Sequence, residues 1–237
     1  MIDFHAHILP CMDDGAENIQ DSLSMLRQSF RQGVHAVVAT PHFYAYEEYP
    51  DEFLKRRHAA ARQLEEAMLF SVEVYPNMIL GAEVLYFPGI SEAAEIPQLC
   101  IGTGKGILIE PPMASWSDNM LDDIACLKQN FGLTPIIAHV DRYMNILQDQ
   151  TLIDRLLRRE LLVQVNGSYF LNPKTRKAAF ANLGSGKIHL IGSDCHDLDS
   201  RPPNLGDVRK ALKARCAEAH LQQIHQNAAN LLMNRRG

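Results

Sequence analysis

Two histidines, His5 and His7, stand one residue apart at the end of a short apolar segment. Side chains of a β-strand alternate between its two faces, so both imidazoles would lie on the same side of a strand. Imidazole is the commonest metal-binding side chain at neutral pH. A second pair of metal-ligand residues, Asp194 and His196, follows the apolar segment 188–192 near the other end of the chain. Either pair alone could arise by chance.

Further apolar segments also end at metal-ligand residues, which makes coincidence a poor explanation. Three of them lead to His42, Glu110 and His139. Apolarity alone defines these segments, and barrel enzymes place their chemistry at the carboxyl ends of their strands. The sequence therefore predicts a metal cluster at the mouth of a barrel. The candidate ligands are His5, His7, Asp13 or Asp14, His42, Glu83, Glu110, His139, Asp194 and His196.

Each candidate also has a simpler explanation when it is taken alone. A lone histidine such as His139 is more often a hydrogen-bonded core residue, and Glu83 and Glu110 could be the first solvated residues after an apolar run. The sequence Asp13-Asp14-Gly15 is by itself only a turn signal. These explanations weaken together, because nearly every strand would have to end in a ligand residue by accident.

Strand-like and helical patterns alternate along the whole chain, which is typical of an α/β protein with a parallel sheet. At 237 residues, a closed barrel is favoured over an open sheet. The loop 8–15 is acidic and lacks the glycine-rich phosphate loop of open doubly wound folds. We predict one domain over residues 1–237, with strands at 72–83, 107–110, 134–139, 162–166 and 188–194. Helices are predicted at 18–33, 51–68, 118–130, 151–160, 174–183 and 205–215, with a terminal helix over 217–235.

Composition narrows the classes of function. The formal charge of −5 argues against a broad nucleic-acid surface but leaves an anionic substrate possible if cations are bound. The chain has no long uncharged apolar run, and its first residues already belong to a strand, so we expect a cytoplasmic protein with no membrane insertion. Five cysteines without a C-x-x-C motif do not form a disulfide or zinc-finger framework. Cys100, Cys126 and Cys216 are predicted to be packed side chains.

The ligand set mixes imidazole and carboxylate, which suits zinc, manganese or iron, and it lacks the thiolates of a structural zinc site. The chain resembles the polymerase-and-histidinol-phosphatase (PHP) superfamily. The resemblance rests on the motifs D-x-H-x-H-x-L-P-x-x-D-D-G, A-T-P-H, G-A-E, L-I-E, I-A-H-x-x-R-Y, V-N and S-D-x-H-x-x-x-x-R-P-P. Within it, the chain is most similar to manganese-dependent tyrosine phosphatases of bacterial capsule and exopolysaccharide gene clusters. The resemblance spans residues 2–230 and implies a distorted (β/α)7 barrel, similar to a TIM barrel, with a C-terminal helix.

The resemblance also implies three metal ions, with Mn²⁺ as the expected metal and Fe or Zn as alternatives. Glu83 would bridge two of the ions, and spacing does not distinguish Asp13 from Asp14. The implied sets are His5, His7, Glu83 and Asp194 for the first ion, Glu83, Glu110 and His139 for the second, and Asp13 or Asp14 with His42 and His196 for the third. The remaining histidines are expected to be structural or surface residues.

Clustered divalent ions lower the pKa of a bridging water and hold the oxygens of a phosphoryl group, so in-line attack of the activated hydroxide on phosphorus is the natural reaction. Two arginines, Arg142 and Arg201, stand close in sequence to ligands and could grip phosphate oxygens in pairs. Surface salt bridges are the alternative for both. We count them, with His139 and His196, as the predicted catalytic residues.

A different reading takes Cys195 and Arg201 as the C-x5-R motif of cysteine-dependent tyrosine phosphatases. The five residues between them contain two carboxylates and no glycine. Such a loop would repel a phosphate dianion and raise the thiol pKa. Cys195 is therefore predicted to be a spacer between two ligands and not a nucleophile.

By resemblance, the predicted substrate is phosphotyrosine on the tail of a membrane-associated bacterial tyrosine kinase that controls polysaccharide export. A histidinol-phosphate type phosphatase, an amidohydrolase-like metal hydrolase and an inactive metal-binding regulator remain alternatives. Aromatic residues in loops 43–46 and 113–116 are candidates for contact with the substrate ring. The oligomeric state is left open.

Overall fold

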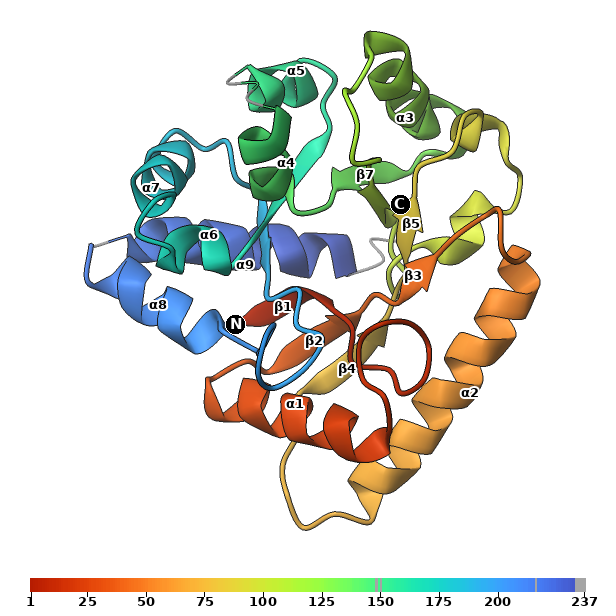
Figure 1. Cartoon of the computed structure of the whole chain (residues 1–237), viewed down its shortest axis with the longest axis vertical. Helices are drawn as coiled ribbons and strands as arrows, with labels where there is room; N and C mark the ends of the chain where they lie inside the picture. The colour runs from red at the N-terminus through yellow and green to blue at the C-terminus, as the bar shows by residue number, and fades with distance from the viewer. Residues whose placement is uncertain (148, 150, 216, 233–237) are drawn as a thin grey trace.

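The structure is a computed structural model that describes residues 1–147, 149, 151–215 and 217–232. Cys216 and residues 233–235 of the predicted terminal helix lie outside these residues. The described chain folds into a mixed α/β unit in which helices surround a strongly curled sheet (Figure 1). The strands are β1 (Ile2–Ala6), β2 (Ala36–Ala39), β3 (His42–Phe43), β4 (Asn77–Leu80), β5 (Glu83–Leu85), β6 (Gly106–Glu110), β7 (Thr134–Ile137), β8 (Leu162–Asn166) and β9 (Leu190–Gly192).

The strands pair in parallel in two hydrogen-bonded groups. The order is β1-β2-β4 in one group and β3-β5-β6-β7-β8-β9 in the other. The groups are continuous, because β3 follows β2 after two residues and an isolated parallel bridge joins Ala6 to Cys195 beyond β9. Hydrogen bonds from Asp194 N to His5 O and from His7 N to Cys195 O, 2.8 and 2.9 Å long, hold this seam. The two ends of the chain therefore meet where both histidine motifs lie.

Most helices lie where the amphipathic patterns of the sequence predict them. Two short helices were not predicted, and one predicted strand needs correction. The short helices α4 and α6 escaped prediction, because four to eight residues give little periodicity. The predicted strand 72–83 is wrong at its start, since Val72 and Val74 are exposed and pairing begins only at Asn77. The helices are α1 (Ile19–Arg31), α2 (Pro50–Leu69), α3 (Asp118–Phe131), α4 (Val140–Leu147), α5 (Leu152–Leu157), α6 (Ser168–Leu171), α7 (Arg176–Gly184), α8 (Leu205–Lys213) and α9 (Glu218–Leu232), with 3₁₀ turns at Ile90–Glu92 and Ile96–Leu99.

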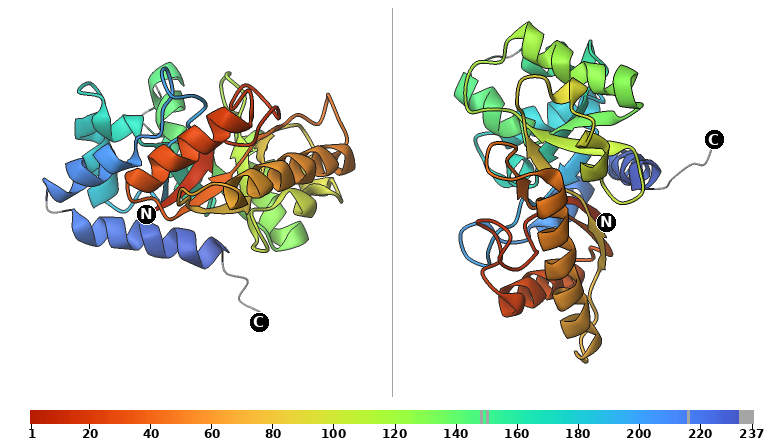
Figure 2. Two further views of the ribbon diagram at one scale, coloured as in Figure 1. Left: turned by 90° about the horizontal axis from the view of Figure 1, so that it is seen from below. Right: turned by 90° about the vertical axis from the view of Figure 1, so that its right-hand side faces the viewer.

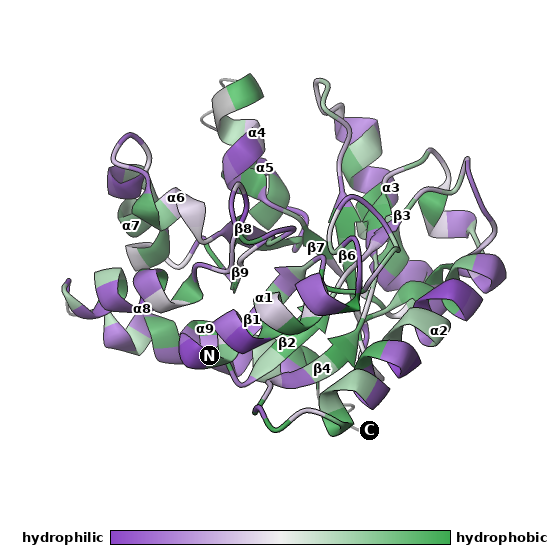
Figure 3. Ribbon diagram, turned by 60° about the horizontal axis from the view of Figure 1, so that its bottom comes forward, coloured by the Kyte–Doolittle hydropathy of each residue, from purple (hydrophilic) through white to green (hydrophobic). Residues whose placement is uncertain are grey.

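Two apolar clusters hold these layers together. The larger lies between the strands and the surrounding helices, where Val163 and Val165 of β8 belong to it. The smaller joins the strands to α9 through Phe4, Leu108 and Ala228. Helix α9 thus packs along the sheet, as the left-hand view of Figure 2 shows. Figure 3 shows the strands as mainly hydrophobic and the helix surfaces as mixed, as burial of a two-sided sheet requires.

Candidate metal centre

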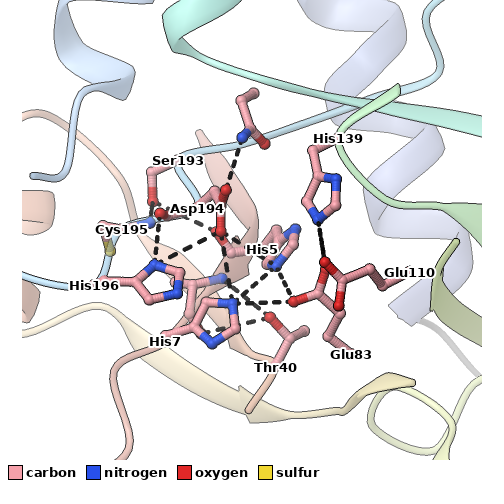
Figure 4. A network of polar contacts seen from close by, with 12 residues as sticks. His5, His7, Thr40, Glu83, Glu110, His139, Ser193, Asp194, Cys195 and His196 are labelled. Carbon is pink, nitrogen blue, oxygen red and sulfur yellow. Dashed lines mark hydrogen bonds and ion pairs between the residues drawn. The ribbon is translucent and has the colours of Figure 1, made fainter. Parts of the chain in front are cut away.

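The candidate ligands from both ends and the middle of the chain converge at one edge of the curled sheet (Figure 4). His5 lies in β1, Glu110 ends β6, and His139 follows β7 after one residue. Because these strands are parallel, their carboxyl ends meet at the same edge. Most of the side chains are buried: His5, His7 and Glu83 are fully inaccessible, and His139, Asp194 and His196 are almost so.

The first group has its potential ligand atoms facing one another. His5 Nε2 lies 3.0 Å from His7 Nε2 and 3.1 Å from Glu83 Oε2, and His7 Nε2 lies 3.2 Å from the same oxygen. Asp194 Oδ1 is 3.6 Å from both imidazole nitrogens. Ligands bound at about 2.0–2.2 Å stand roughly 3.0–3.5 Å apart around a tetrahedral or octahedral cation. These atoms therefore fit a shared metal ion.

Two further groups adjoin the first. His139 Nε2 lies 2.8 Å from Glu83 Oε1 and 3.5 Å from Glu110 Oε1. On the other side, His196 Nε2 lies 3.3 Å from Asp14 Oδ1. His42 stands between the groups, with Nε2 3.6 Å from Asp14 Oδ1 and Nδ1 3.2 Å from Glu83 Oε2. Glu83 thus faces both neighbouring groups, as a bridging carboxylate would.

Some buried nitrogens of this cluster have no hydrogen-bond partner. They are Nδ1 of His42, Nδ1 of His139 and Nε2 of His196. Buried polar atoms normally find partners, so the orphaned His196 Nε2, which faces the Asp14 carboxylate, indicates a site for an electron-pair acceptor. A divalent cation bound to His196 Nε2 and its neighbours would meet that need.

The two adjacent aspartates play different parts. Asp13 Oδ2 lies 2.7 Å from His7 Nδ1 and accepts the His42 N–H at 2.9 Å, while Oδ1 accepts from Gly15 N. Burial lowers the pKa of His7, but the carboxylates of Asp13 and Glu83 together outweigh burial and raise this pKa well above its usual range. Both oxygens of Asp13 are therefore already hydrogen-bonded. Its position beside the candidate ligand His7 is that of a carboxylate that orients a metal-bound histidine. Asp14 carries the oxygen that faces the cluster.

The backbone has unusual conformations at several candidate ligands. The pairing of β1 with β2 slips between Asp3 and Ala6, and such a bulge re-aims side chains. His139 and Asp194 have φ of 31° and 54°, a left-handed conformation that only the surrounding structure can maintain. A Cβ on Gly192 would lie 2.4 Å from His5 Cβ, so glycine is required where β9 approaches this ligand.

Sequence reasoning missed two polar residues of β8. Gln164 Oε1 accepts the His139 N–H at 2.6 Å and lies 3.3 Å from His5 Nδ1. Asn166 Nδ2 donates to Asp194 Oδ2 at 2.8 Å. Their signals in the sequence are a polar residue at every second position of an otherwise apolar strand and, for Asn166, its place in the V-N motif.

Comparison with known proteins shows the family of this chain. A sequence model described as "Capsular polysaccharide synthesis, CpsB/CapC" matches residues 1–234. The chain belongs to this family. Tyrosine-protein phosphatase CpsB of Streptococcus agalactiae serotype III is 28% identical, with 99% of both chains covered. Tyrosine-protein phosphatase YwqE of Bacillus subtilis is 27% identical, with 99% of this chain and 92% of YwqE covered.

Solved structures also relate this CpsB/CapC family member to tyrosine phosphatases. The structure described as YwqE from B. subtilis and CpsB from Streptococcus pneumoniae, "unique metal-dependent tyrosine phosphatases", matches with a TM-score of 0.87 and 26% identity, covering 98% of this chain and 94% of that one. A phosphotriesterase homology protein from Escherichia coli, with a TM-score of 0.55 and 11% identity, shares the fold alone. The predicted relationship to capsule-cluster tyrosine phosphatases is confirmed.

Both predicted phosphate-binding arginines lie at the cluster, each paired with one of its carboxylates. Arg142 Nη2 donates to Asp194 Oδ2 at 2.7 Å, and Arg201 Nη2 donates to Asp14 Oδ2 at 2.8 Å. Both side chains remain partly exposed. Together with Asp194 they line a cavity of about 660 Å³. The arginines therefore stand at the boundary between the candidate metal centre and an open space.

Cys195 is fully buried, and burial raises the pKa of its thiol far above the usual range. A thiol held neutral is a poor nucleophile. In Figure 4 its sulfur lies at the left-hand margin of the cluster.

Of the loop aromatics predicted to contact substrate, Phe43 and Trp116 are buried and belong to the core, whereas Tyr44 is half-buried and Tyr46 is exposed. No helix among the described residues is long and apolar enough to span a membrane.

Proposed function

We propose that this chain is a metal-dependent protein-tyrosine phosphatase of capsular or exopolysaccharide synthesis. The observation that carries the proposal is the convergence of buried imidazole and carboxylate atoms at 3.0–3.6 Å beside two arginines and a cavity. The relatives named as tyrosine-protein phosphatases support the same activity.

We assign three ions with the ligand sets that the family resemblance implies. Short distances between ligand atoms within each set support the assignment, and His42 also approaches Glu83 and Glu110. Asp14, not Asp13, completes the third set, because Asp13 already accepts from His7 and the backbone. Mn²⁺ is the proposed metal, with Fe or Zn as alternatives, because the set has no thiolate. The sets are His5, His7, Glu83 and Asp194; Glu83, Glu110 and His139; and Asp14, His42 and His196.

When bound, the ions would activate a water for in-line attack and neutralise phosphate charge. The chain's own residues do the rest. His139 and His196 would act as ligands, and Glu83, which faces two groups of candidate ligands, would contribute to both. Arg142 and Arg201 stand beside the carboxylates of Asp194 and Asp14, where they would grip the phosphoryl oxygens of a bound substrate. Phenolate, with a reference pKa near 10, leaves more readily than an alkoxide, so a strong general acid is less necessary.

Tyr44 supplies the contact for the substrate's ring. Its ring stacks on His42 at a centroid distance of 5.3 Å, and Tyr46 stacks on Tyr44 at 5.6 Å. With Asp14 and His42, Tyr44 also lines a second cavity of about 210 Å³. An aromatic ladder leading from a ligand to solvent suits a flat phenyl ring.

The finer fold assignment is a distorted (β/α)7 barrel that forms one domain over residues 1–237. The support comes from counting the strands. If β2 and β3 are taken as one interrupted strand, and β4 and β5 as another, the nine short strands become seven parallel strands around the sheet. A cytoplasmic location and the tyrosine-rich tail of a bacterial tyrosine kinase as substrate remain predictions.

Three substrates compared on one manganese-loaded preparation test the function. We expect kcat/KM for a phosphotyrosine peptide to exceed that for a phosphoserine peptide and for histidinol phosphate by at least about tenfold, roughly 1.4 kcal/mol of discrimination. Exhaustive chelation should abolish all activity, and Mn²⁺ should restore it. A preference for histidinol phosphate would overturn the tyrosine-phosphatase assignment and leave the metal chemistry standing.

A further inference from the structure

Strand β8 carries none of the candidate ligands among the described residues, yet two of its polar side chains are buried against them. Gln164 is fully inaccessible and Asn166 is 7% exposed. They stand two positions apart, so both side chains point to the same face of the strand. A buried amide destabilises a protein unless its hydrogen bonds are made. The partners of these two amides therefore indicate why they are there.

The orientation of the Gln164 amide is fixed by two oxygens. Its Nε2 donates to Val165 O at 2.9 Å and to Asn166 Oδ1 at 3.2 Å. The reverse orientation would place a carbonyl oxygen against two other oxygens, so the NH₂ group must face them. Oε1 then points the opposite way, where it accepts the backbone N–H of His139 at 2.6 Å.

The same oxygen determines the tautomer of His5. Gln164 Oε1 lies 3.3 Å from His5 Nδ1, and an amide oxygen can only accept a hydrogen bond. Nδ1 must therefore carry a proton. In the neutral imidazole, the lone pair is then on Nε2, which is the atom that faces His7 Nε2 and Glu83 Oε2.

Asn166 orients the carboxylate of Asp194 in a similar way. Its Oδ1 accepts from Gln164, so its Nδ2 is directed at Asp194 Oδ2. This leaves Asp194 Oδ1 to face His5 and His7 at 3.6 Å. Arg142 donates to the same Oδ2 at 2.7 Å, so both hydrogen bonds hold this oxygen away from the histidines.

We infer that Gln164 and Asn166 are positioning residues of the metal centre, which hold His5 with Nε2 and Asp194 with Oδ1 towards the ions. The inference rests on the proposed metal centre and is independent of the substrate. Residues that hydrogen-bond to a metal-bound histidine typically change metal affinity by about 10- to 100-fold when they are replaced.

The first experiment measures Zn²⁺ and Mn²⁺ affinity by competition with a chelator. Gln164→Leu removes the acceptor and should weaken binding by about 10- to 100-fold. Gln164→Glu, with a protonated carboxyl that accepts from His5 and His139 through one oxygen and donates to Val165 O or Asn166 Oδ1 through the other, should bind at least several-fold more tightly than Gln164→Leu. Asn166→Leu should also weaken binding, through the loss of the oriented Asp194 oxygen.

Gln32→Leu is the matched control for loss of a structural glutamine. Gln32 Oε1 also accepts a backbone N–H, from Gly206 at 2.9 Å, and Nε2 donates to Pro203 O. It contacts none of the candidate ligands, so its replacement should leave metal affinity within about twofold of the wild-type value.

The second experiment reads the tautomer directly in the wild-type protein and therefore does not depend on a variant that folds. Nitrogen-15 NMR of the zinc-loaded, histidine-labelled protein should show His5 with a protonated Nδ1 and a metal-bound Nε2. A metal-bound Nδ1, or unchanged affinity in folded Gln164→Leu, would overturn the inference. A protein that passes both tests but hydrolyses no phosphotyrosine would instead overturn the proposed function.

Discussion

Asp13 lies behind the His7 ring, with Oδ2 2.7 Å from Nδ1, on the side of the imidazole opposite the cluster. Asp14, the next residue, turns its own Oδ1 towards His196 at 3.3 Å. We therefore expect Asp14→Asn to lower the number of ions bound per protein. Asp13→Asn should keep the stoichiometry and weaken affinity by about tenfold, because the ring it orients remains in place. Elemental analysis after dialysis against graded free metal distinguishes the two, and loss of an ion in Asp13→Asn alone would reverse the assignment.

The thiol of Cys195 has no chemical part in this mechanism, since it is buried and its pKa is raised by burial. Cys195→Ala should therefore keep most of the wild-type rate on p-nitrophenyl phosphate. His139→Ala and Asp194→Ala should lose most of it, because each removes a ligand atom from the cluster. The assignment fails if Cys195→Ala retains its metals and is inactive.

Arg142 and Arg201 are assigned to the phosphate. Arg142→Ala and Arg201→Ala should each lower kcat/KM by roughly 10- to 100-fold, since a hydrogen bond to a charged group contributes about 1.5–3 kcal/mol. Bound metal should not change. Arg159→Ala is the control, because Arg159 pairs with the exposed carboxylates of Asp118 and Asp122 away from the cluster. Metal loss in the two site variants would show that they hold the ligands in place and do not bind the substrate.

Tyr44 is expected to select aromatic phosphates. Tyr44→Leu should lower kcat/KM for a phosphotyrosine peptide by about 2- to 12-fold, equivalent to an aromatic contact of roughly 0.5–1.5 kcal/mol. Tyr44→Phe keeps the ring stacked on His42 and should behave like the wild-type enzyme. Equal losses on phosphotyrosine and phosphoserine peptides would contradict a role in ring recognition.

Residue types and their local spacing predicted most of the strands, the candidate ligands and the family of this protein. Apolar runs marked the strands, and the residues that end them, such as His139 and Glu110, are the ones that converge. The reason is physical: parallel strands present their carboxyl ends at one edge, so a pattern local in sequence becomes a cluster in space. The motif set also identified the family that comparison confirmed.

Only the tertiary structure shows which side-chain atoms face the candidate metal centre and which support it from behind. Asp13 and Asp14 are equivalent in sequence, and only the positions of His7 and His196 around them separate a supporting carboxylate from a candidate ligand. Gln164 could not be recognised from sequence, because its role depends on His5, 159 residues away. Trp116 looked like a loop aromatic and is core. Hydrogen-bond orientation and burial depend on contacts between distant segments, and a linear pattern of residue types does not contain those contacts.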